Sequence, residues 1–107
     1  MYQLKITDLA QQDIETAYLW WCKHRSTVQA ELWYMEIHGA ISSLQENPGR
    51  CQLAPENNLI SHKIRQLLTS IGKRPTHRIV YAISNNTVTI LRVRHVAQDS
   101  LLADDLV

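Results

Sequence analysis

Features of membrane-bound, secreted and disordered proteins are missing from this 107-residue chain. No segment approaches the roughly 18 to 20 consecutive apolar residues of a membrane-spanning helix. The start, Met1–Ile6, lacks the basic and apolar regions of a secretory signal, so we expect a cytoplasmic protein. The composition, 45% hydrophobic and 20% charged, argues against a disordered tail protein. The length predicts one domain over residues 1–107.

Cysteines and catalytic motifs are equally scarce. Cys22 and Cys51 are the only two cysteines, fewer than a disulfide-stabilised secreted domain usually carries, and we expect both to be reduced. The histidines show no metal-ligand spacing with them. Glycine-rich phosphate loops, nucleophile elbows and zinc-protease motifs are absent. The sequence therefore predicts neither a metal nor a cofactor.

The net charge is only +1, but it is unevenly distributed. Residues 1–56 contain four Lys/Arg and seven Asp/Glu, whereas residues 57–107 contain seven and three. This asymmetry points to an anionic partner for the second half, although many domains with such a charge bind no nucleic acid.

Apolar periodicity in the first half predicts a strand and two helices. Residues 2–6 alternate between apolar and polar, which is typical of a half-buried strand. One helical stripe runs from Asp8 to about Arg25, and a second runs from Ser26 to Asn47-Pro48-Gly49, where proline and glycine end it. Because almost nothing joins the two helices, they must form an antiparallel hairpin.

The second half is predicted to form three strands. These cover residues 63–68, 78–83 and 87–94, and a tight turn at 84–86 makes the last two a hairpin. The tail, 97–107, fits either a short helix or a disordered end. The order strand, helix, helix and three strands predicts an α+β fold in which a helical hairpin packs on one face of a small antiparallel sheet.

Basic side chains recur at corresponding places on the predicted strands. They are Lys63, Arg65, Arg78, Arg92, Arg94 and His95. If the strands are neighbours, several of these groups converge at one end of the sheet. Arginine binds phosphate oxygens through paired hydrogen bonds, and a histidine can transfer a proton near neutral pH. The alternative is that these residues form the solvated face of a half-buried sheet.

Four segments, in this order, resemble the ParE/RelE toxin superfamily, and most of all its ParE-like, plasmid-stabilisation branch. They are residues 48–56 (PGRCQLAPE), 63–68 (KIRQLL), 77–83 (HRIVYAI) and 88–95 (VTILRVRH). The resemblance covers about residues 2–99 and implies a toxin held inactive by a cognate antitoxin. RelE-like members cut messenger RNA on the ribosome, whereas ParE-like members poison DNA gyrase. A third possibility is an inert relative that only binds its antitoxin.

The resemblance also assigns roles by position. Arg78 matches the arginine of the family's Arg-(Leu/Ile)-Val-Tyr strand, Lys63 and Arg65 match the basic pair of the preceding strand, and His95 matches a histidine after the last strand. These four would be the catalytic residues of a metal-independent endoribonuclease. However, residues 96–99 lack the tyrosine or further arginines of many nuclease members, and basicity is low. Both departures favour a gyrase poison.

A partner surface is predicted on the helices. Trp20 lies off the apolar stripe of the first helix, and Leu32 and Met35 lie off that of the second. Together with Arg92 and Arg94 they would suit an acidic, amphipathic antitoxin segment that folds on binding. The alternatives are that these apolar residues form a toxin homodimer, or pack beneath the tail.

Overall fold

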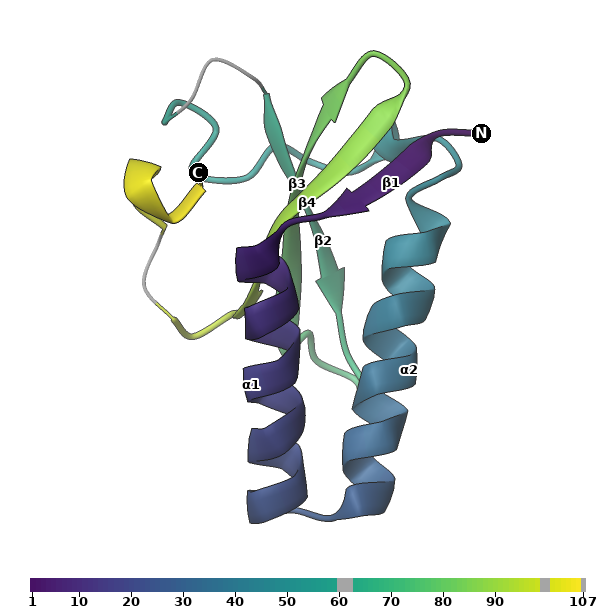
Figure 1. Cartoon of the computed structure of the whole chain (residues 1–107), viewed down its shortest axis with the longest axis vertical. Helices are drawn as coiled ribbons and strands as arrows, with labels where there is room; N and C mark the ends of the chain where they lie inside the picture. Colours follow the sequence, from purple (N-terminus) through teal and green to yellow (C-terminus); the bar gives the residue numbers. More distant parts are fainter. Residues whose placement is uncertain (60–62, 99–100, 107) are drawn as a thin grey trace.

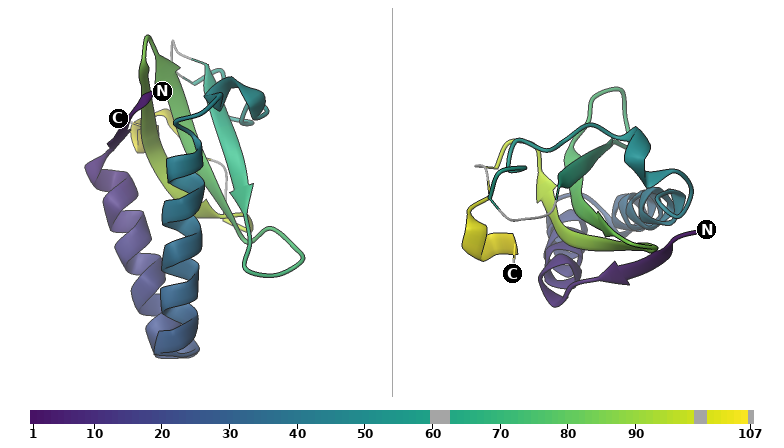
Figure 2. Two further views of the ribbon diagram at one scale, coloured as in Figure 1. Left: turned by 90° about the vertical axis from the view of Figure 1, so that its right-hand side faces the viewer. Right: turned by 90° about the horizontal axis from the view of Figure 1, so that it is seen from above.

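The computed structural model describes residues 1–59, 63–98 and 101–106, which form two layers (Figure 1). Two antiparallel helices, α1 (Asp8–His24) and α2 (Thr27–Ser43), lie side by side on one face of a four-stranded sheet (Figure 2). The strands are β1 (Gln3–Ile6), β2 (Ile64–Thr69), β3 (His77–Ser84) and β4 (Thr87–His95), and the short 3-10 turns are η1 (Pro48–Arg50) and η2 (Ala103–Leu106). The predicted α+β architecture and element order are confirmed.

One strand pairing differs from the prediction. The sheet order is β1-β4-β3-β2, and β1 pairs in parallel with β4, from Gln3 opposite Thr87 to Ile6 opposite Ile90. The sheet is therefore mixed, not entirely antiparallel. A tight turn forces β3 and β4 to be antiparallel, but β1 is followed by a helix, so nothing local fixes its partner or its direction.

Helix starts follow the predicted capping chemistry, with one shift. Ser26 accepts a hydrogen bond from the backbone N–H of Gln29 at 3.1 Å, as the spacing predicts. At the first helix the cap is Thr7, one residue earlier than expected, and its hydroxyl accepts from the N–H of Ala10 at 3.1 Å. The same hydroxyl donates to the carbonyl of Leu91 at 2.9 Å, which joins the start of α1 to β4.

Both faces of the sheet are covered. The helix-side core contains Trp33, Ile37, Ile79, Tyr81, Val88 and Ile90. On the other face a second cluster contains Ala54, Ile64, Val80, Ala82, Leu91, Leu101 and Leu106. The loop before β2 and the C-terminal turn thus cover a face that a two-layer prediction leaves open. No helix in the described ranges is long and apolar enough to cross a membrane.

Candidate functional site

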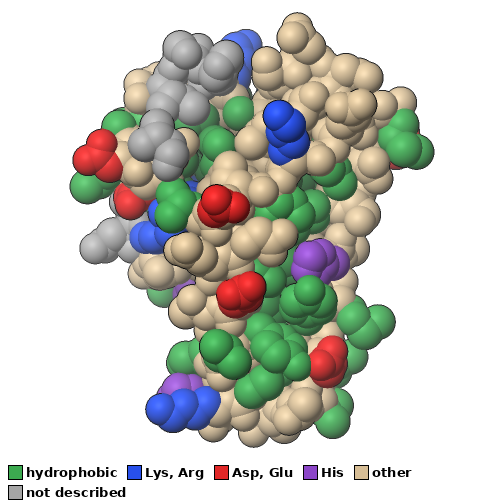
Figure 3. Space-filling model, viewed as in Figure 1, with side chains coloured by type: hydrophobic (Ala, Val, Ile, Leu, Met, Phe, Trp, Pro, Cys, Tyr) green, Lys and Arg blue, Asp and Glu red, His purple; other side chains and the backbone are tan. Residues whose placement is uncertain are grey.

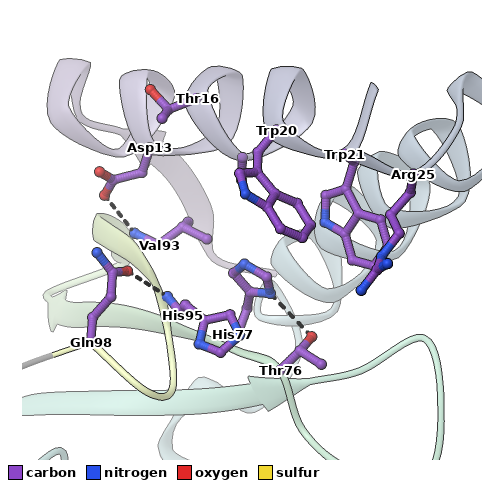
Figure 4. A pocket seen from close by; sticks show the side chains of 11 residues that line it. Asp13, Thr16, Trp20, Trp21, Arg25, Thr76, His77, Val93, His95 and Gln98 are labelled. Carbon is purple, nitrogen blue, oxygen red and sulfur yellow. Dashed lines mark hydrogen bonds between the residues drawn. The ribbon is translucent and has the colours of Figure 1, made fainter. Parts of the chain in front are cut away.

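A cavity of about 570 Å³ lies between α1 and the end of the sheet where β3 begins and β4 ends (Figure 4). Its walls are formed by Asp13, Thr16, Ala17, Trp20, Trp21, Arg25, Thr76, His77, Val93, His95 and Gln98. The volume of this cavity and its largely apolar lining are typical of small-molecule sites, in which a few polar groups fix the orientation of the ligand.

Aromatic rings dominate the cavity. The rings of Trp20 and Trp21 are nearly perpendicular, at 88° and 5.6 Å between centroids, and those of His77 and His95 meet at 76° and 5.2 Å. Trp20 also stacks on His24 at 4.8 Å, yet 46% of its surface remains exposed. The helix and the sheet therefore present two pairs of rings to one space.

The two histidines have defined hydrogen-bonding roles. The Nε1–H of Trp33 donates to Nδ1 of His77 at 3.2 Å, and the backbone N–H of Ala97 donates to Nδ1 of His95 at 3.0 Å. With Nδ1 accepting, the proton of each neutral ring is on Nε2. Burial, reinforced by the electrostatic effect of His95, lowers the pKa of His77 to about 4, so His77 is neutral at pH 7.

An ion pair borders the cavity and ties three elements together. Arg92 on β4 donates from Nε and Nη2 to the carboxylate of Asp13 on α1, at 2.7 and 2.8 Å. The same carboxylate accepts from the N–H of Val93 at 2.9 Å, on the edge of β4 away from β3 and beyond the last residue paired with β1. Arg92 also donates to the carbonyl of Asp105 in η2 at 3.2 Å. The hydrogen bonds to Asp13 raise the pKa of Arg92, which stays charged.

A second ion pair is buried on the opposite face of the sheet. Both Nη atoms of Arg78 donate to the carboxylate of Glu56, which also accepts from the N–H of Leu101 at 2.9 Å. The two residues are 8% and 3% exposed. Burial alone raises the pKa of Glu56, but the hydrogen bonds from Arg78 and Leu101 outweigh it and hold that pKa below its ordinary value. Gln66 accepts from Arg78 at 3.2 Å.

The structure does not bring the four positions of the predicted nuclease site together. Arg78 faces Glu56 on one side of the sheet, whereas His95 lines the cavity on the other. Arg65 donates to the carbonyl of Cys51 at 2.6 Å and pairs with Tyr81, three positions or about 10 Å along the strand from Arg78. Lys63 is exposed and precedes β2.

Arg78, Arg92 and Arg94 share the face of the sheet that lies away from the helices. Arg94 lies opposite Arg78 in the β3–β4 register, and Arg92 lies opposite Val80, whose side chain is in the second cluster. The solvated-face alternative is wrong for Arg78 and Arg92, because ion pairs and the covering segments bury much of both side chains.

The predicted partner residues do lie off the core. Trp20 is 46%, Leu32 50% and Met35 67% exposed. Further exposed apolar residues on the same two helices are Leu19, Val28 and Tyr34. Figure 3 shows hydrophobic side chains gathered where the helices face the viewer. Exposed apolar residues that gather in this way are typical of contact surfaces.

Sequence reasoning missed three residues that organise these sites. His77 comes directly before the apolar run that identifies the strand of Arg78. Because His77 and Ile79 are two positions apart in a strand, their side chains share a face, and this spacing could have placed His77 on the side of the helices. Asp13 and Glu56 carry no local signal, because their partners are distant in sequence. Within residues 1–59, 63–98 and 101–106, no three His, Cys, Asp or Glu side chains are grouped as metal ligands.

Comparisons with known proteins agree with this architecture. A sequence family described as "ParE toxin of type II toxin-antitoxin system, parDE" matches residues 4–100. The chromosomal ParDE toxin–antitoxin system from P. aeruginosa contains a chain with 19% identity and a TM-score of 0.70, over 90% of this chain and 97% of that one.

The toxin–antitoxin complex RelBE2 from Mycobacterium tuberculosis contains a chain with 24% identity and a TM-score of 0.52, over 91% of this chain and 93% of that one. At these identities the likeness to both solved structures establishes the fold alone. No curated protein sequence gives a significant match.

Proposed function

Because this chain belongs to the family of ParE toxins of type II toxin–antitoxin systems, we propose that it arrests bacterial growth by inhibiting DNA gyrase in the cytoplasm. We further propose that a cognate antitoxin neutralises it. Resemblance to the wider ParE/RelE superfamily leaves both gyrase and ribosome-bound messenger RNA as candidate targets.

The choice of gyrase depends on one observation: the two arginines that would have to bind a phosphate are already paired with carboxylates. Arg78 is paired with Glu56, and Arg92 with Asp13. A scissile phosphate would have to displace a carboxylate that already accepts paired hydrogen bonds. Arg78 and His95 also lie on opposite faces, so they are poorly placed to act on one phosphate. This arrangement supports a binding mode of inhibition over RNA cleavage.

Two assays on the purified chain test this choice. We expect inhibition of gyrase supercoiling with accumulation of cleaved DNA, and intact messenger RNA on programmed ribosomes. Cleaved message that depends on Arg78 and His95 would instead establish the nuclease. Expression of the chain alone should stop growth, and co-expression of the neighbouring small gene should restore it. Normal growth despite soluble expression would point to an inert antitoxin-binding relative.

We propose that the antitoxin contacts the exposed apolar residues Trp20, Leu32 and Met35. Both similar structures come from toxin–antitoxin systems, and a segment that folds on binding can wrap a large surface of its partner. Arg92 and Arg94, on the opposite face of the sheet, would serve an acidic segment only if it displaced the covering tail. The helix surface is therefore the main contact in this proposal.

Alanine substitutions test the antitoxin surface. We expect Trp20→Ala and Met35→Ala each to weaken antitoxin binding about fivefold or more, as for truncated hot-spot residues. Ile71→Ala, at an exposed apolar residue outside the helices, is the matched control and should bind normally. Unchanged affinity in both helix variants would refute this surface. If the isolated toxin is a dimer that either variant dissociates, the surface serves self-association.

A further inference from the structure

The gyrase inhibition proposed above does not use the cavity between α1 and the sheet, and of the residues proposed to contact the antitoxin Trp20 borders it. Its lining nevertheless combines aromatic rings with a few polar groups. In Figure 4, Trp20 and Trp21 on α1 and Arg25, which follows the helix, point toward His77 and His95 on the sheet. A ligand in this space would contact aromatic surface from both layers.

The aromatic walls favour a flat ring. The rings of each pair are nearly perpendicular, at 88° for Trp20 with Trp21 and at 76° for His77 with His95, so a flat ligand that stacks on one ring of a pair meets the other at its edge. Ring–ring contacts of either kind are more favourable than the apolar area alone accounts for. An aliphatic ligand of equal size would forgo this contribution.

The polar lining favours a negative charge or a group rich in acceptors. His77 and His95 each accept at Nδ1, so their Nε2–H groups are donors. The guanidinium of Arg25 lies 5.8 Å from the centre of the Trp20 ring. Asp13 is the acidic residue in the lining, and its carboxylate is already bound by Arg92. The charge left for a ligand is therefore positive.

We propose that this cavity binds a planar aromatic ligand that carries an acidic group. The ring lies between the indoles of α1 and the imidazoles of the sheet, and Arg25 binds the anion. Two sources share this chemistry, namely small aromatic carboxylates and nucleotides. The site does not depend on the identity of the toxin's target, so it stands or fails separately from gyrase inhibition.

Matched ligand pairs test each element of the proposal by calorimetry with the purified full chain. Indole-3-carboxylate is compared with indole-3-carboxamide, and adenosine 5′-monophosphate with adenosine, so that only the charge changes. Cyclohexanecarboxylate supplies the charge without the ring. We expect at least one of the two aromatic anions to bind, and its neutral partner and the aliphatic acid to bind at least about tenfold more weakly. The aromatic anion that binds more tightly identifies the source.

Variants then locate the site. Arg25→Gln should weaken binding of the aromatic anion about tenfold, with partial rescue by Arg25→Lys, and Trp20→Leu should weaken it about three- to tenfold. Leu68→Ala is the control, since Leu68 is an exposed apolar residue on the opposite face of the sheet. Because Trp20 and Arg25 are exposed, these variants should keep the wild-type melting temperature.

Three results would overturn the proposal. One is no binding of either aromatic anion at millimolar concentration. A second is equal binding of charged and neutral partners, which would remove the role of Arg25. The third is binding that is unchanged in Arg25→Gln and Trp20→Leu while both variants remain folded, which would place the ligand elsewhere on the chain.

Discussion

Replacing Glu56 with alanine removes the carboxylate that neutralises Arg78 on the covered face of the sheet. Among the described residues the guanidinium would keep its hydrogen bond to Gln66 alone, and the N–H of Leu101 would lose its acceptor. Arg78 is 8% exposed, so water cannot fully replace the lost partner. Breaking one side of a buried ion pair typically costs about 3 to 5 kcal/mol. A domain of this size has a free energy of unfolding of about 5 to 15 kcal/mol, so the variant should be severely destabilised.

Chemical denaturation at pH 7 measures this loss directly. The double variant Glu56→Leu with Arg78→Met is the control, because it replaces the ion pair with apolar groups suited to the neighbouring cluster. It should recover most of the lost stability, since apolar replacements of buried ion pairs are often neutral or stabilising. A loss below about 1 kcal/mol in Glu56→Ala would show that Arg78 reaches solvent, and the covering role assigned to the tail would be wrong.

The Glu56 carboxylate also predicts a pH dependence. Its pKa is lower in the folded chain than in the unfolded chain, so it contributes stability above its ordinary pKa of 4.5. That contribution is lost as the pH falls through the folded pKa. We therefore expect the stability difference between the wild type and Glu56→Ala to shrink below about pH 4, and a difference that is constant down to pH 2 would contradict the lowered pKa.

Three further perturbations test other contacts. Folding lowers the pKa of His77 to about 4, so the unfolded chain binds a proton at this residue more readily than the folded chain. The free energy of unfolding should therefore fall as the pH is lowered from about 6.5 to about 4, and it should fall less steeply in His77→Leu. Asp13→Ala should reduce stability by about 2 to 4 kcal/mol and speed amide exchange at Val93, whose N–H loses its acceptor; slow exchange there would contradict this. Leu106→Ala should lower stability by about 2 to 4 kcal/mol if the tail is packed as described, and a neutral effect in thermal melting would argue against that packing.

The sequence alone determined the elements and most of the layers. Apolar residues at helical spacing from Asp8 and Ser26 specified two helices, and the Asn47-Pro48-Gly49 segment specified where the second one ends. The asparagine turn at 84–86 specified the β3–β4 hairpin. These features depend on backbone conformational preferences and on the spacing of apolar side chains, both of which are properties of short segments. The exposure of Trp20, Leu32 and Met35 followed from the same periodicity, because a residue off the buried stripe of a helix must face elsewhere.

Tertiary structure decided what the polar residues do. The sequence showed that Arg78 and Arg92 lie on strands, but not that Glu56 and Asp13 reach them, since these partners are 22 and 79 positions away along the chain. Pairing at that separation depends on how the loop and α1 pack against the sheet. The same holds for β1, whose parallel pairing with β4 has no local cause. Charge placement in a sequence identifies residues able to bind an anion, whereas packing determines whether an internal carboxylate already occupies them.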